Sequence, residues 1–138
     1  MNLEDQVVSL ELSKKLKGLG VNKDSLWSWY TKGTQKAVSG GDETIHLKIE
    51  GYKLSCPAYT AAEMGEILPK ELGGDYGGVF ITTVTNNYGW DCDYYSFFRD
   101  KSASQLEKAD TFQFMSNTEA DARAKMLIYL LENEIVKL

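Results

Sequence analysis

The sequence predicts an α+β fold, in which a mainly antiparallel sheet is packed by two longer helices, one near each end of the chain, and by one short helix. Amphipathic helical patterns occupy residues 3–18 and 116–138. Alternating segments that are rich in aromatic residues lie between these two patterns, and tight turns separate several of them, which favours antiparallel pairing. The length fits one domain that spans residues 1–138.

Residues 3–18 are expected to form the first helix, with Asn2 as its cap. Valine and leucine side chains recur there at helical spacing. The sequence Gly18-Leu19-Gly20 supplies a stop, because a glycine can take a positive φ angle and Val21 can close the end with an apolar contact.

Two strands and one short helix are predicted in the middle of the chain. Residues 26–31 form an aromatic strand, and residues 45–49 alternate between apolar and polar side chains. A short helix follows over residues 61–68, where Thr60 and Glu63 fit a capping box and Pro69 ends the helix. Gly65 lies inside this helix, which indicates that another group packs closely against it.

Residues 79–85 and 90–99 form a predicted hairpin around the sequence Asn86-Asn87-Tyr88-Gly89, and a short strand at 112–114 precedes the last helix. The stretch 116–138 is the clearest helix in the chain. Its apolar stripe consists of Ala120, Ala124, Leu127, Ile128, Leu131 and Ile135.

Two pairs of residues could form the N-terminal cap of the last helix: Ser116 with Glu119, or Thr118 with Asp121. An acidic residue is followed four residues later by a basic one at two places in this helix, which predicts ion pairs between Glu119 and Arg123 and between Asp121 and Lys125. The stripe must dock on the sheet, since an isolated helix of this length is marginally stable.

Composition limits the class of protein. No apolar run is long enough for a membrane span, and the first residues lack a signal-peptide pattern, so we expect a cytoplasmic protein without membrane contact. Cys56 and Cys92 are expected to be reduced. The net charge is −5, and residues 40–101 carry ten acids and five bases, which argues against a nucleic-acid groove.

Two sequence blocks carry a family resemblance: P-A-Y-T-A-A-E-M-G-E-I-L-P at 57–69 and T-E-A-D-A-R-A-K-M-L-I-Y-L-L-E-N at 118–133. Together with residues 8–21 and 26–30, they resemble a family of small uncharacterised proteins of bacteriophages, prophages and gut bacteria of the Bacteroides type. This resemblance implies a phage or prophage accessory protein in the host cytoplasm. It assigns no catalytic role to any residue.

The aromatic side chains suggest an interaction surface. Aromatic residues are more numerous than one covered sheet face requires, and an exposed group of them would mark a protein interface, often between two copies of a chain. The candidate surface consists of Trp27, Trp29, Tyr95 and Phe97. The alternative is that both sheet faces are covered, which would make these residues part of the core.

Residues that could carry chemistry are few. His46 is the only histidine, and Asp91 and Asp93 share one strand face, so a small enzyme that uses these three residues in a cleft is the alternative function. A metal site built from Cys56, Cys92, His46 and Asp91 lacks the close spacing typical of zinc ligands. We therefore predict no catalytic residue, metal or cofactor.

The preferred hypothesis is a non-enzymatic module that binds a protein partner or a second copy of itself. An acidic decoy for a nucleic-acid-binding host protein is a third and weaker hypothesis, which rests only on the charge of residues 40–101.

Overall fold

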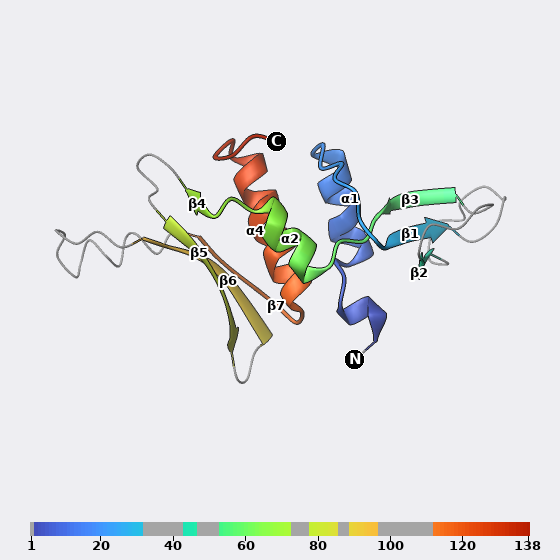
Figure 1. The fold of residues 1–138 in the computed structure, drawn as a ribbon, viewed down its shortest axis with the longest axis horizontal. Coiled ribbons are helices and arrows are strands. Elements are labelled where there is room, and N and C mark those ends of the chain that lie inside the picture. Colours follow the sequence, from blue (N-terminus) through green and yellow to red (C-terminus); the bar gives the residue numbers. More distant parts are fainter. Residues whose placement is uncertain (1, 32–42, 47–52, 73–77, 86–88, 97–111) are drawn as a thin grey trace.

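A computed structural model describes residues 2–31, 43–46, 53–72, 78–85, 89–96 and 112–138 (Figure 1). In chain order these residues form η1 (Leu3–Asp5), α1 (Leu10–Gly18), β1 (Ser28–Thr31), β2 (Glu43–His46), β3 (Lys53–Pro57), α2 (Ala61–Ile67), β4 (Glu71–Leu72), β5 (Gly78–Thr85), β6 (Gly89–Ser96), β7 (Phe112–Ser116) and α4 (Glu119–Glu132). Helices and antiparallel strands together confirm the α+β class.

The described strands form two sheets, although the sequence suggested a single one. A three-stranded sheet has the order β2-β1-β3, and a four-stranded sheet has the order β4-β5-β6-β7. In Figure 1 the helices α1, α2 and α4 lie between these two sheets. Alternation along a strand indicates which faces are apolar but not which strands pair, so the division into two sheets is not visible in the sequence.

The N-terminal helix is shorter than the predicted range 3–18. Only η1 and α1 are helical, and the chain between them is extended at Val7 and Val8. Val7 forms an isolated antiparallel bridge with Thr60, and the Val8 N–H donates to the Tyr59 carbonyl at 2.8 Å. These β-branched residues suit an extended backbone, and both side chains are buried, so tertiary pairing overrides the helical pattern.

The end of α1 confirms the predicted stop. Gly20 has a φ angle of +90°, the Val21 N–H donates to the Leu16 carbonyl at 3.0 Å, and the Gly20 N–H donates to the Lys17 carbonyl at 3.0 Å. These two bonds define a Schellman motif. Val21 and Leu16 are both buried, which supplies the apolar contact that closes it.

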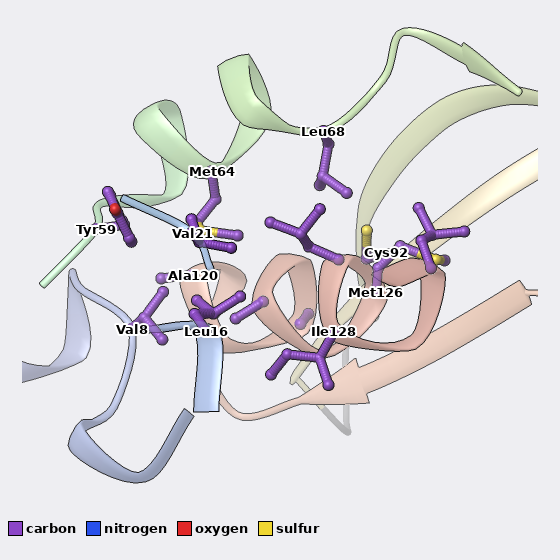
Figure 2. Close-up of a cluster of buried hydrophobic side chains, with 14 of the residues drawn as sticks. Val8, Leu16, Val21, Tyr59, Met64, Leu68, Cys92, Ala120, Met126 and Ile128 are labelled. Carbon is purple, nitrogen blue, oxygen red and sulfur yellow. The ribbon is translucent and has the colours of Figure 1, made fainter. Parts of the chain in front are cut away.

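Helix α4 lies at the centre of the larger hydrophobic core (Figure 2). It packs against β6 and β7 on one side and against α1 and α2 on the others. Burial therefore extends beyond the predicted stripe to further side chains of this helix, which are Ala122, Met126 and Leu130. Figure 2 shows Met64 and Leu68 of the α2 region and Cys92 of β6 around the side chains of α4.

The second predicted cap is the one that starts α4. The Thr118 side chain accepts the Asp121 N–H at 3.2 Å. The predicted pair of Glu119 with Arg123 is present, whereas Lys125 donates to the Met115 carbonyl at 2.9 Å and Asp121 accepts from the backbone of Ser9. The helix ends at Glu132, so Ile135 lies beyond it.

Glu134 closes α4 in a left-handed conformation with a φ angle of +54°. The Ile135 N–H donates to the Leu130 carbonyl at 2.9 Å, and the Glu134 N–H donates to the Leu131 carbonyl at 3.2 Å, which is again a Schellman motif. A side chain at this position is strained, because the left-handed region costs a residue other than glycine roughly 1–2 kcal/mol.

We expect Glu134→Gly to raise the free energy of unfolding by about 0.5–1 kcal/mol, because relief of this strain exceeds the extra entropy that glycine gives the unfolded chain. Urea denaturation measures the change. Glu134→Ala is the matched control, because alanine keeps the strain and should leave stability close to that of the native chain. Equal stabilisation by both substitutions would contradict the explanation.

Helix α2 begins with the predicted capping box. The Thr60 hydroxyl accepts the Glu63 N–H at 3.2 Å, and Glu63 Oε2 accepts the Thr60 N–H at 2.7 Å. Leu68 leaves the helix in an extended conformation with ψ 134°, as expected of a residue that precedes proline.

The predicted hairpin is present as β5 and β6, which pair antiparallel from Gly78 with Ser96 to Thr85 with Gly89. Residues 86–88 of the predicted turn lie outside the described residues. The face of β6 that carries Trp90, Cys92 and Tyr94 packs on the core around α4, and β7 pairs with the other edge of β6.

Tyr59 connects the start of α2 to the segment that follows α1, and its pKa is raised. Its ring is buried and its hydroxyl donates to the Lys23 carbonyl at 2.7 Å. Burial, followed by the nearby charges of Glu63 and Asp24, raises the pKa of Tyr59 from 10.0 to about 12. Burial also raises the pKa of Tyr94, whose hydroxyl donates to the Pro69 carbonyl at 2.6 Å.

We expect stability to fall as the pH rises from 10 to 12, because the unfolded chain loses the Tyr59 proton near pH 10 while the folded chain keeps it to about pH 12. The full loss from this group is about 2–3 kcal/mol. Urea midpoints across this range should fall less steeply for Tyr59→Phe than for the native chain. Parallel pH profiles of the two proteins would contradict the assignment.

Candidate binding pocket

A pocket of about 480 Å³ opens where η1, the start of α2, the start of α4 and the start of β6 meet. Its volume lies within the range of ligand-binding pockets. The lining combines an indole ring with small apolar side chains and polar side chains. These residues are Asp5, Gln6, Thr60, Ala61, Ala62, Trp90, Asn117, Thr118, Glu119 and Ala120.

The N-terminal ends of α2 and α4 converge on the pocket, and both begin with a threonine cap whose hydroxyl accepts a backbone N–H. The positive end of each helix dipole also meets acidic residues in the first turn, Glu63 in α2 and Glu119 and Asp121 in α4. The positive charge at the start of each helix is therefore already offset by acidic side chains of the same helix.

The N-terminal segment forms one wall and is fixed to both helices. Val7 pairs with Thr60 at the start of α2. The Ser9 N–H donates to Asp121 Oδ1 in the first turn of α4 at 2.7 Å. Because each contact joins residues far apart in the sequence, the tertiary fold anchors the wall formed by Asp5 and Gln6, in addition to the local hydrogen bonds of η1.

Arg123 joins the two helices behind the pocket. Its Nη1 donates to the Ala61 carbonyl at 2.6 Å, and its Nη2 is bonded to Glu119. A methyl group at Gly65 would lie 2.3 Å from Nη1. This confirms the expectation that a group packs closely on Gly65, and it identifies that group as the guanidinium of Arg123.

We expect Gly65→Ala to lower stability by about 1 kcal/mol, although the same change in an open helix raises stability by about 1 kcal/mol. The methyl group displaces Arg123 from the Ala61 carbonyl and from Glu119. In an Arg123→Ala background the substitution should recover the normal gain, which gives a coupling free energy of about 2 kcal/mol in a double-mutant cycle. Stabilisation by Gly65→Ala in both backgrounds would contradict this packing.

The structure separates the residues of the predicted interaction surface. Trp27 is half-buried and follows Leu26, which is 65% exposed. Trp29 is buried in a second core with Val7, and its Nε1 donates to the Val8 carbonyl at 3.1 Å, so we assign it to the core and remove it from the surface. The Tyr95 side chain and Phe97 lie outside the described residues.

Both neighbouring aromatic residues in β1 are covered. Tyr30 points to the opposite sheet face from Trp29 and is also buried. Trp29 and Tyr30 therefore belong to the core, as the alternative interpretation of the aromatic residues expected.

The residues of the enzyme alternative do not share a site. His46 belongs to β2 in the three-stranded sheet, whereas Asp91 and Asp93 belong to β6 in the four-stranded sheet. Figure 1 shows β2 and β6 on opposite sides of the helices. Asp91 is buried, and its Oδ1 has no hydrogen-bond partner within the described part of the chain.

The residues weighed as metal ligands are divided in the same way, because Cys56 lies in β3 and Cys92 in β6. Both cysteines are buried and neither forms a disulfide. Across the described ranges, no three histidine, cysteine or acidic residues are grouped as metal ligands would be.

Sequence reasoning did not identify the pocket. The sequence places Trp90 at the start of the predicted strand 90–99, and Asp5 and Gln6 in the predicted helix 3–18. The two capping signals at Thr60 and Thr118 did mark the helix ends that face the pocket, but nothing in the sequence indicated that these ends meet.

Comparison of the chain with protein-family models, with curated protein sequences and with solved structures finds no match. Among the described helices, none has the length and apolar character needed to cross a membrane.

Proposed function

We propose that the chain is a protein-binding module that works without catalysing a reaction, and that its contact surface is centred on the pocket between η1, α2, β6 and α4. The observation that carries this proposal is the pocket itself, whose lining combines the half-buried Trp90 with alanines, neutral polar residues and two acidic residues. Partner side chains that contribute most to binding usually enter such pockets, and tryptophan is enriched among the residues that receive them.

The positions of the ionisable residues favour binding over catalysis. A general acid or base must lie within hydrogen-bond reach of the group that reacts. His46 lies in a different sheet from Asp91 and Asp93, and neither aspartate is among the described residues that line the pocket. The enzyme alternative that relied on these residues therefore lacks a common cleft in which they could act.

We propose a phage or prophage accessory role in the host cytoplasm as the setting for this binding. The support is the resemblance carried by residues 57–69 and 118–133. Both blocks contribute to the pocket lining, the first with Thr60, Ala61 and Ala62 and the second with Thr118, Glu119 and Ala120. The proteins that resemble this chain would then share these six residues of the pocket lining.

Site-specific photo-cross-linking in cells tests the proposal. A benzophenone amino acid at Ala62, which is exposed and lines the pocket, should give a discrete adduct with a partner protein. The matched control carries the same group at Glu11, which is exposed on α1 and does not line the pocket. Absence of an adduct at Ala62, or equal adducts at both positions, would contradict a binding surface at the pocket.

Sedimentation equilibrium of the purified chain distinguishes the two kinds of partner. If the partner is a second copy, the apparent mass should rise with concentration, and the adduct at Ala62 should have twice the mass of the chain. If the partner is another protein, the chain should remain monomeric over the same range while the adduct persists in cells.

A further inference from the structure

We propose that the pocket receives the guanidinium group of an arginine side chain presented by the partner protein. This inference rests on the proposed function and specifies the chemistry of the group that enters the pocket. It depends on three features of the lining: its charge, its aromatic wall and the number of its hydrogen-bond acceptors.

The charge of the lining favours a cation. Among the described residues, Asp5 and Glu119 are the charged ones that line the pocket, and both are acidic. Arg123 compensates Glu119, whereas the Asp5 side chain is exposed and makes no hydrogen bond or ion pair with the described residues. The uncompensated carboxylate of Asp5 would repel an anion. The positive ends of the α2 and α4 dipoles would not attract one, because acidic residues in their first turns already offset them.

The aromatic wall favours a planar cation. Trp90 is half-buried, packs against the core around α4, and lines the pocket. Tryptophan gives the strongest cation–π contacts of the aromatic residues, and a guanidinium can also stack its flat face on the ring. The core holds the indole in place, so little side-chain entropy is lost when a ligand stacks on it.

The polar atoms of the lining favour a group with several donors. Three segments of the chain contribute lining residues that carry acceptor oxygens: Asp5 a carboxylate, Thr60 a hydroxyl, and Asn117 and Thr118 an amide and a hydroxyl. Each threonine hydroxyl already accepts one capping N–H and has a second lone pair. A guanidinium has five N–H donors in a rigid fork and can reach several acceptors at once, whereas an ammonium is a compact and strongly hydrated charge.

The test is a titration of the ¹⁵N-labelled full chain with the peptide acetyl-Gly-Arg-Gly-amide, followed by NMR. The control peptide replaces arginine with citrulline, which has the same shape without the charge. We expect the arginine peptide to shift the Trp90 indole resonance and the amides of Ala62 and Ala120, with an affinity at least about tenfold higher than that of the citrulline peptide. Comparable shifts with both peptides, or none with either, would overturn the proposal.

Asp5→Asn should weaken binding of the arginine peptide by about fivefold to tenfold, because it removes the uncompensated charge at the pocket. Glu11→Gln changes the net charge of the chain by the same amount on the exposed surface of α1, outside the pocket lining, and should leave the affinity unchanged. Both variants should keep the urea midpoint of the native chain, so that a change in affinity is not a change in folding. Equal affinities of the two variants would overturn the role of Asp5.

Trp90→Phe keeps an aromatic ring and Trp90→Leu removes it, so the affinity should fall in that order while each variant stays folded. The cross-linking at Ala62 separates this inference from the proposed function. An adduct at Ala62 together with no preference for arginine would reject the guanidinium and leave the protein-binding surface in place.

Discussion

Gly89→Ala should destabilise the protein by about 3 kcal/mol, which is the largest effect that we expect from any of these substitutions. Gly89 has a φ angle of +105°, which side-chain-bearing residues rarely adopt. An added methyl group would also lie 2.3 Å from the Ser116 carbonyl oxygen and 3.2 Å from the Asn117 Cα. Both are backbone atoms, so neither can move without shifting β7 and the start of α4.

Urea denaturation measures this loss, and the slope of the transition should stay unchanged if only stability is affected. Gly18→Ala is the control. A methyl group at Gly18 has no atom within 4 Å, and the residue lies in the last turn of α1, so the change should be neutral or stabilising. A Gly89→Ala variant as stable as the native chain would show that β6 and β7 are not joined as the register with Ser116 requires.

Glu63→Ala should lower the free energy of unfolding by about 2 kcal/mol, because the Glu63 carboxylate accepts hydrogen bonds from two separate segments. Its Oε2 accepts the Thr60 N–H at 2.7 Å and the Ser25 hydroxyl at 3.1 Å, and its Oε1 accepts the Leu26 N–H at 3.0 Å. Loss of the carboxylate therefore removes the Glu63 half of the capping box of α2 and also releases the segment that leads into β1.

Glu63→Gln should cost less than Glu63→Ala, because the amide keeps one acceptor oxygen but turns its NH₂ group toward a backbone donor. Glu66→Ala on the same helix is the control, since Glu66 is exposed and should change stability by less than about 0.5 kcal/mol. If Glu63→Ala behaves like Glu66→Ala, the carboxylate does not hold the Ser25 segment on α2.

Local signals in the sequence predicted the local structure well. Capping residues at Thr60 and Thr118, the glycine stop at Gly20 and the break before Pro69 each depend on neighbours within a few residues, and all four were confirmed. The close approach at Gly65 was also predicted, because glycine inside a helix is unfavourable unless another group needs the space.

Long-range pairing could not be predicted in the same way. Val7 and Val8 fit a helical stripe by spacing, and only their bonds to Thr60 and Tyr59 make this segment extended. Trp29 could belong to a surface or to a core, and the choice depends on the N-terminal segment that covers it. The pocket depends on the same contacts, which explains why Asp5 and Trp90 were not recognised together.

The central claim is that α4, which packs on β6, β7, α1 and α2, unfolds together with the N-terminal segment as one cooperative unit, so that the pocket is formed before a partner binds. Hydrogen exchange of the native protein tests it most directly. We expect the backbone amides of Ala122 to Leu130 to exchange only when the whole protein unfolds, and the same for the Ser9 amide, which donates to Asp121 Oδ1. The free energy of exchange should then equal the free energy of unfolding from urea denaturation. Exchange of the Ser9 amide or of the amides in α4 by a separate opening of much lower free energy would contradict the claim.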